Sequence, residues 1–220
     1  MATPQPVRNI VFDIGWVLVR LNYRPLLELL HRHGAELADR DAVMRGIRLE
    51  DHETGQLSGE GLLERLRGLT RARTVSLEEM RAKWLDMFEL EPAMIELAHR
   101  LSERYRVFLL SNIGDLHWTH LAREYRLHAI GHGALPSYVA GVMKPHPGIY
   151  AEAERRFALE PAATVFIDDL AANVATARGR GWHGIVHRDQ GSTVAGLEAL
   201  GVGTVRYISS SVRQAPLDEE

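Results

Sequence analysis

The sequence predicts an α/β protein in which a doubly wound sheet of parallel strands carries an inserted helical cap. Three short apolar runs, residues 10–12, 107–110 and 165–167, each end in a polar residue, as is typical of buried parallel strands. Helical stretches separate these runs, and such alternation implies βαβ units with right-handed crossovers. Between residues 21 and 91 the strand signal vanishes and leucines recur at helical spacing.

The predicted elements follow one another in βαβ order along the chain. The first strand ends at Asp13, the second at Ser111 and the third at Asp168. In such a Rossmann-like sheet ligands bind beyond the carboxyl ends of the strands, so we expect these side chains to converge there. The pattern also favours helices over 93–104, 147–157 and 171–180, weaker strands over 133–137 and 184–187, and a last helix over 192–200.

We predict a core domain made of residues 1–20 and 92–220, with residues 21–91 inserted as a helical cap. The leucines of the insertion are expected to form its packed interior. Ser76 followed by Glu79 resembles a capping box, which predicts the start of a helix at this point.

Composition narrows the classes of function. The net charge is -3, with 26 basic and 29 acidic residues mixed along the chain, so neither nucleic acid nor a membrane surface is expected as a partner. No apolar stretch approaches the roughly 20 residues that span a bilayer, and residues 1–8 lack the apolar core of a secretion signal, so we expect a cytoplasmic protein. The absence of cysteine excludes thiolate chemistry, so covalent chemistry must use oxygen or nitrogen.

The strand ends and the loops that follow them carry four short motifs. In chain order these are Phe12-Asp13-Ile14-Gly15, Ser111-Asn112, Lys144-Pro145, and Asp168-Asp169 with Asn173. Their order and context resemble the haloacid dehalogenase-like superfamily over nearly the whole chain. The resemblance implies a Mg²⁺-dependent phosphatase that acts on a small phosphorylated metabolite through an aspartyl-phosphate.

The resemblance also implies a role for each motif residue. Asp13 resembles the family's nucleophile, and a carboxylate can attack phosphorus to give an aspartyl-phosphate that water later hydrolyses. Ser111 resembles the hydroxyl that binds phosphate, and Asn112 beside it is expected to add a backbone amide. Lys144 is expected to neutralise charge on the nucleophile and on the phosphoryl group.

The adjacent carboxylates of Asp168 and Asp169, expected near Asp13, make a hard oxygen site of the kind that Mg²⁺ prefers. By resemblance, Asp168 and Asp13 coordinate the ion together with the backbone carbonyl of Gly15. Asp169 is not expected to contact the ion directly but to orient water that is bound to it. Asn173, one turn into the next helix, is expected to steady this arrangement.

Gly15 is a departure from the pattern of most phosphatases in the superfamily. They place a second aspartate at this position, where it acts as general acid and base, and such a group contributes about 10²- to 10⁴-fold. A subgroup that includes α-glucose-1-phosphate phosphatases also has glycine here, and the continuation Val17-Leu18-Val19 resembles that subgroup. An anomeric hydroxyl leaves more readily than an ordinary alcohol, so a sugar 1-phosphate is our hypothesis for the substrate.

The cap offers two alternatives for the missing acid, His52 and Glu53, which lie at a polar break in the insertion. Trp16, directly after Gly15, is expected to narrow the substrate pocket or to stack on a sugar, with plain packing as the other interpretation. The eleven histidines show no ligand spacing such as His-Glu-x-x-His, so we predict no histidine metal site.

Two other functions stay open at this point. A haloacid dehalogenase uses the same aspartate without a metal, although the pair Asp168-Asp169 would then repel an anionic substrate. A non-catalytic member that binds a phosphorylated ligand or a protein is suggested by Gly15 and Trp16. The sequence identifies neither the metabolite nor the oligomeric state.

Overall fold

The structure is a computed structural model that describes residues 5–36, 39–71 and 75–204. In these residues five parallel strands form one sheet in the order β5-β4-β1-β6-β7. The strands are β1 (Asn9–Phe12), β4 (Arg106–Ser111), β5 (Ala134–Pro136), β6 (Thr164–Asp168) and β7 (His183–Val186). The predicted α/β class with a parallel sheet is confirmed, including the two weaker strands.

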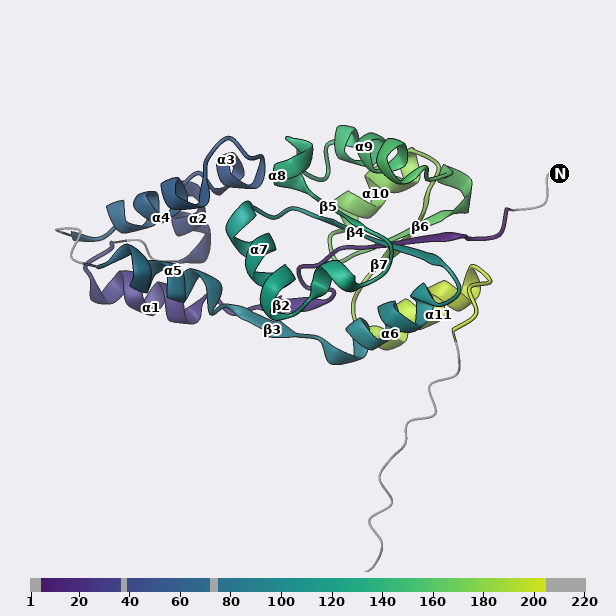
Figure 1. Cartoon of the computed structure of the whole chain (residues 1–220), viewed down its shortest axis with the longest axis horizontal. Coiled ribbons are helices and arrows are strands. Elements are labelled where there is room, and N and C mark those ends of the chain that lie inside the picture. The colour runs from purple at the N-terminus through teal and green to yellow at the C-terminus, as the bar shows by residue number, and fades with distance from the viewer. Residues whose placement is uncertain (1–4, 37–38, 72–74, 205–220) are drawn as a thin grey trace, which may run out of the picture.

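Helices cover both faces of the sheet (Figure 1). On one face lie α9 (Pro147–Phe157) and α10 (Ala171–Gly179), and on the other lie α6 (Pro92–Ser102) and α11 (Gln190–Ala199). Each strand packs against the helices on both faces of the sheet, because successive side chains of a strand point to opposite faces.

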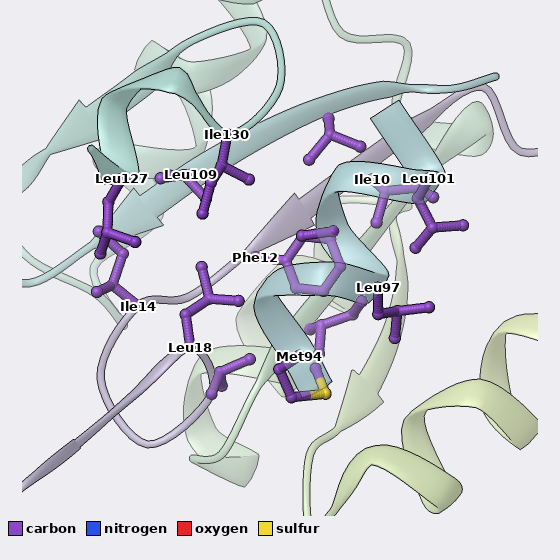
Figure 2. Close-up of a cluster of buried hydrophobic side chains, with 14 of the residues drawn as sticks. Ile10, Phe12, Ile14, Leu18, Met94, Leu97, Leu101, Leu109, Leu127 and Ile130 are labelled. Atoms are coloured by element: carbon purple, nitrogen blue, oxygen red, sulfur yellow. The ribbon is translucent and has the colours of Figure 1, made fainter. Parts of the chain in front are cut away.

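The alternation is clearest in the central strand. Ile10 and Phe12 join the buried cluster beneath α6, as Figure 2 shows, while Val11 joins the cluster beneath α9. Burying an apolar side chain of this size contributes about 1.5–3 kcal/mol. The chain around the site is therefore held from both sides.

The chain between β1 and α6 folds into helices that lie beyond one end of the sheet (Figure 1). We call α1 to α5 the helical insertion. Its helices are α1 (Arg24–Arg32), α2 (Arg40–Gly46), α3 (Leu49–Glu53), α4 (Gly59–Gly68) and α5 (Leu77–Leu85). They enclose a hydrophobic cluster of their own, which contains Leu26, Leu30, Leu62 and Leu66. The Ser76 hydroxyl accepts a hydrogen bond of 3.0 Å from the Glu79 N–H, which caps α5 as expected.

A two-stranded antiparallel ribbon joins the helical insertion to the sheet. It pairs β2 (Val19–Leu21) with β3 (Phe88–Leu90). The expectation of no strand between residues 21 and 91 was wrong for β3, because three residues are too short for an alternation pattern and pairing with β2 makes the strand. The predicted boundaries at residues 21 and 91 lie at this ribbon and stay a prediction. Residues 1–4 and 205–220 of the predicted core lie outside the described residues.

The helical insertion packs against two helices that follow strands of the sheet. These are α7 (Asp115–Glu124) and α8 (Ser137–Ala140). The Ser137 hydroxyl donates a 2.6 Å hydrogen bond to the backbone carbonyl of Glu53, at the end of α3. His117 of α7 stacks on Trp84 of α5 with ring centroids 4.5 Å apart. Among the described residues, none of the helices is long and apolar enough to cross a membrane.

Candidate active site

Three carboxylates meet at the carboxyl edge of the sheet. Strands β1 and β6 are neighbours in register, with Phe12 opposite Ile167, so the residues that follow them emerge side by side. Each of Asp13, Asp168 and Asp169 offers a carboxylate oxygen, and these oxygens lie within 4.8 Å of one another. The expected convergence of strand ends is therefore present in the structure.

Lys144 lies between two of these carboxylates. Its Nζ is 2.8 Å from Asp13 Oδ1 and 2.7 Å from Asp168 Oδ2, and its side chain is buried. Burial alone would lower the pKa of Lys144, but the charges of Asp13 and Asp168 outweigh it and raise the pKa above its ordinary value. Lys144 is thus a fixed cation inside the site.

Asp168 is the most firmly held member of the cluster. Its Oδ1 accepts hydrogen bonds from the Leu170 N–H at 2.8 Å and from Asn173 Nδ2 at 2.9 Å. Asn173 Nδ2 also lies 3.0 Å from Oδ2, so this amide spans the whole carboxylate. The side chain of Asn173 therefore stands where it can fix the orientation of Asp168.

Asp13 is buried at the end of β1, and its Oδ1 accepts a 2.6 Å hydrogen bond from the Ile14 N–H. The pKa of Asp13 is raised to about 7, chiefly by burial; the Lys144 charge opposes the rise, and the Asp168 charge adds to it. Burial also raises the pKa of Asp169, together with the charge of Asp168. Three carboxylates against one ammonium leave the site short of positive charge, so its donor set suits a hard divalent cation.

The loop that carries Lys144 is anchored by the end of β4. Asn112 Nδ2 donates to the Lys144 carbonyl at 2.8 Å, and the Lys144 N–H donates to Asn112 Oδ1 at 2.8 Å. The side chain of Asn112 is thus used to position Lys144, a role that the sequence did not indicate. Its expected contribution to a phosphate, through the backbone amide, stays a prediction.

A cavity of about 60 Å³ lies between the sheet edge and the helical insertion, and we call it the enclosed cavity because residues of both parts line it. From the sheet edge it is lined by Gly15, Ser111 and Asn112. The other lining residues that matter for chemistry come from the ribbon, the insertion and α7, and they are Tyr23, Glu53, Trp84, Phe88 and His117. Tyr23, Trp84 and Phe88 were missed by sequence reasoning, because aromatic residues in a helical segment normally indicate packing and no motif marks them.

The two cap residues considered as acids occupy different environments. Glu53 lines the enclosed cavity, whereas His52 is buried beside α7, with Nδ1 3.0 Å from the Leu57 carbonyl oxygen and Nε2 3.6 Å from Asp115 Oδ1. His52 is not among the residues that line the enclosed cavity. Of the two alternatives, only Glu53 lines the cavity that Gly15 and Ser111 also line.

Trp16 lies outside the enclosed cavity. It is 46% exposed and lines a separate cavity of about 330 Å³ together with Arg20, His187 and Arg188. Its φ of 58° is in the left-handed region, which bulky residues rarely adopt. In the structure, Trp16 lines this separate cavity and not the enclosed cavity. The role expected for Trp16 in substrate binding stays a prediction.

A parallel sheet with helices on both faces, an acidic cluster at its carboxyl edge and a buried lysine among the carboxylates define an α/β enzyme. The model of one protein family, described as haloacid dehalogenase-like hydrolase, matches residues 7–181. The chain belongs to this family of hydrolases.

Several solved structures share the fold. An HAD family enzyme from Bacteroides thetaiotaomicron, bt-2542, is 23% identical with a TM-score of 0.77, over 87% of this chain and 99% of that chain. A protein from Porphyromonas gingivalis, described as a predicted HAD-like family hydrolase, is 27% identical with a TM-score of 0.72, over 91% and 100%. The L-2-haloacid dehalogenase from Xanthobacter autotrophicus, solved with chloropropionic acid covalently bound, is 15% identical with a TM-score of 0.57, over 90% and 85%. The Bacteroides enzyme has also been solved with magnesium and inorganic phosphate.

Proposed function

We propose that this protein is a Mg²⁺-dependent phosphatase that hydrolyses a small phosphorylated metabolite through an aspartyl-phosphate on Asp13. One observation carries the proposal: three carboxylates lie within 4.8 Å of one another, and Lys144 is bonded to two of them. The magnesium and phosphate bound by the Bacteroides enzyme support it.

Asp13 and Asp168 would hold Mg²⁺, and the backbone carbonyl of Gly15 is our proposal for a further ligand; Asp169, whose carboxylate lies within 4.8 Å of theirs, would support the site from outside the direct ligands. The bound ion would neutralise the carboxylates and the phosphoryl oxygens, which lets an anionic nucleophile approach an anionic substrate. The carboxylates suit this ion because Mg²⁺ prefers hard oxygen ligands.

The contacts of Asp13 indicate which oxygen attacks. Among the described residues, the Ile14 N–H and Lys144 Nζ both contact Oδ1, so we assign the attack to Oδ2. The new bond joins Oδ2 to phosphorus while the bond from phosphorus to the leaving oxygen breaks. Ser111, Lys144 and the Asn112 amide would hold the phosphoryl oxygens. Water then attacks phosphorus, the bond to Asp13 breaks, and phosphate leaves.

We infer that residues 21–91 act as a cap over this site. The cavity that reaches Ser111 is lined by residues of both the sheet edge and the helical insertion. Such a cover excludes water, which strengthens the interactions of charged groups during phosphoryl transfer.

For the substrate we propose a sugar phosphate, in line with the resemblance to α-glucose-1-phosphate phosphatases at Gly15. The enclosed cavity of about 60 Å³ has room for little more than the reacting group. The sugar would therefore extend into the adjoining open cavity of about 440 Å³, which Arg45, Arg48 and Glu53 help to line. Equal kcat/KM for alkyl phosphates and sugar 1-phosphates would contradict this choice.

The experiment that tests the function is a panel of phosphate monoesters assayed with Mg²⁺ and with EDTA, alongside Asp13→Asn. We expect phosphate release that needs the metal and falls to background in the variant, because the amide cannot form the covalent intermediate.

A haloacid dehalogenase is the second candidate, favoured by the similar fold of the Xanthobacter enzyme. Halide release from a 2-haloacid that survives EDTA would establish it. If neither phosphate nor halide is released, a non-catalytic module that binds a phosphorylated ligand becomes the better explanation.

A further inference from the structure

The proposed reaction needs a proton for the departing oxygen, and position 15 has no side chain to give one. The titratable side chains among the described residues that line the enclosed cavity are Tyr23, Glu53 and His117. Burial raises the pKa of Tyr23 above its ordinary value, so its phenol is a weak acid here. Burial lowers the pKa of His117 to about 3, so its ring is neutral.

We propose that Glu53, which the helical insertion brings to the cavity, is the catalytic acid that protonates the leaving oxygen in place of a residue at position 15. This inference rests on the proposed phosphatase function and adds a catalytic residue to it.

The position of Glu53 suits this role. It lines the enclosed cavity together with Gly15 and Ser111, and it also lines the open cavity together with Arg45 and Arg48. Glu53 thus stands where the proposed phosphoryl site meets the space for the leaving group.

The backbone of Glu53 is held in place from the core. Its carbonyl oxygen accepts the 2.6 Å hydrogen bond from the Ser137 hydroxyl, which fixes the end of α3 to α8. An acid that acts in the transition state must be positioned in this way, because proton transfer requires hydrogen-bond distance.

The surroundings keep a large share of the Glu53 carboxyl protonated near neutral pH. Its pKa is raised to about 7, chiefly by burial; the charges of Arg40 and Lys144 oppose the rise, and the Asp13 charge adds to it. A carboxyl group with such a pKa can give up a proton at physiological pH, which an ordinary glutamate cannot do efficiently.

The proton of the Glu53 carboxyl ends on the leaving oxygen, and a proton from water later replaces it. Asp13 Oδ2 forms a bond to phosphorus, and the bond between phosphorus and the leaving oxygen breaks with its electron pair on that oxygen. The oxygen takes the proton of the Glu53 carboxyl and departs as an alcohol. When water attacks the aspartyl-phosphate, its proton returns to the Glu53 carboxylate.

The structure also allows a rescue experiment, in which a substitution at position 15 restores the acid that Glu53→Gln removes. A Cβ atom at Gly15 would lie 3.5 Å from Leu21 Cδ1, which is ordinary van der Waals contact, and the backbone there is not left-handed. Position 15 can therefore accept a Cβ atom, and we expect the carboxyl group of Gly15→Asp, beside the cavity that Gly15 lines, to supply an acid when Glu53 is removed.

The test compares Glu53→Gln with wild type on two substrates, p-nitrophenyl phosphate and glycerol phosphate. The aryl leaving group needs no proton, whereas the alkoxide does. We expect kcat/KM for glycerol phosphate to fall by about 10²- to 10⁴-fold and that for p-nitrophenyl phosphate to stay close to wild type. Glu60→Gln is the matched control, because Glu60 is an exposed glutamate of the helical insertion, in α4, and is not among the residues that line either cavity.

The double variant Gly15→Asp with Glu53→Gln should recover glycerol phosphate hydrolysis. An equal loss on both substrates, or no loss on either, would overturn the role of Glu53, and retained aryl activity shows that the variant is folded. Failure of the proposed function looks different, since wild type would then release phosphate from neither substrate.

Discussion

The side chain of Lys144 separates two carboxylates that otherwise face each other at the sheet edge, Asp13 and Asp168. Removing one partner of a buried ionic cluster costs about 3–5 kcal/mol, because the remaining charge is left without compensation. Asn112 adds two hydrogen bonds to the Lys144 backbone, so both the charge and the position of this lysine are fixed. At this scale the site is organised before any substrate arrives.

The pKa of Glu53 leads to a prediction for pH. Its raised value of about 7 means that the carboxyl group loses its proton as pH rises through that range, so kcat/KM for an alkyl phosphate should fall there. The charged and titratable groups facing it are Tyr23, Arg40, Glu50, Asp13 and Lys144. The measurement is the pH profile of kcat/KM on alkyl and aryl phosphates, in wild type and Glu53→Gln.

The aryl substrate is the internal control for this profile, because its hydrolysis depends on the same titration of Asp13 but needs no proton from Glu53. The falling limb should be present only for the alkyl phosphate in wild type. The same limb on both substrates, or a limb that persists in Glu53→Gln, would assign the titration to another group.

At the scale of elements, the contact between α3 and the start of α7 decides how the helical insertion sits on the core. Gly114, the residue before α7, leaves no room for a side chain, since a Cβ atom there would lie 2.1 Å from the ring of His52. His52 is only 1% exposed and cannot move aside freely. Because Glu53 follows His52 in the chain, this contact also limits how closely Glu53 approaches the sheet edge.

Gly114→Ala should accordingly push α3 away from the core. Overpacking of this kind costs about 1–3 kcal/mol, and we expect a lower melting temperature together with a lower kcat/KM on alkyl phosphates. Gly68→Ala is the control, because a Cβ at this helical position meets nothing within 4 Å. Calorimetry and kinetics of the two variants check the prediction, which is wrong if Gly114→Ala behaves like Gly68→Ala.

For the whole molecule, the acidic cluster couples metal binding to stability. An ion that binds only the folded state stabilises it by about 2.7 kcal/mol at a concentration 100 times its Kd. We expect Mg²⁺ to raise the melting temperature of wild type by several degrees, and EDTA to remove both this shift and phosphate release. Asp168→Asn should lose the shift, because it removes a ligand charge while keeping the shape of the side chain.

Asp86→Asn is the matched control for the metal experiment, since Asp86 is a surface residue at the end of α5 and outside the cluster. It should keep the Mg²⁺-dependent shift. A shift that persists in Asp168→Asn would place the ion elsewhere.

Much of this molecule follows from local patterns in the sequence. Strands β1, β4 and β6 each contain an uninterrupted apolar run, and that is enough to predict parallel strands and a convergence of the polar residues at their ends. The leucines of the insertion likewise predict helices. The ribbon strand β3 escaped prediction, because only its pairing with β2 makes it a strand.

The fold class and the polar residues at the strand ends can be predicted from the sequence alone, since these depend on hydrophobic runs and on short motifs. The tertiary structure alone decided that Glu53 lines the cavity while His52 packs against α7, and that the Asn112 side chain holds Lys144. It also decided that Trp16 faces a neighbouring cavity. The physical reason is that these relations join segments far apart in the chain, and their geometry depends on how the helical insertion packs against the core.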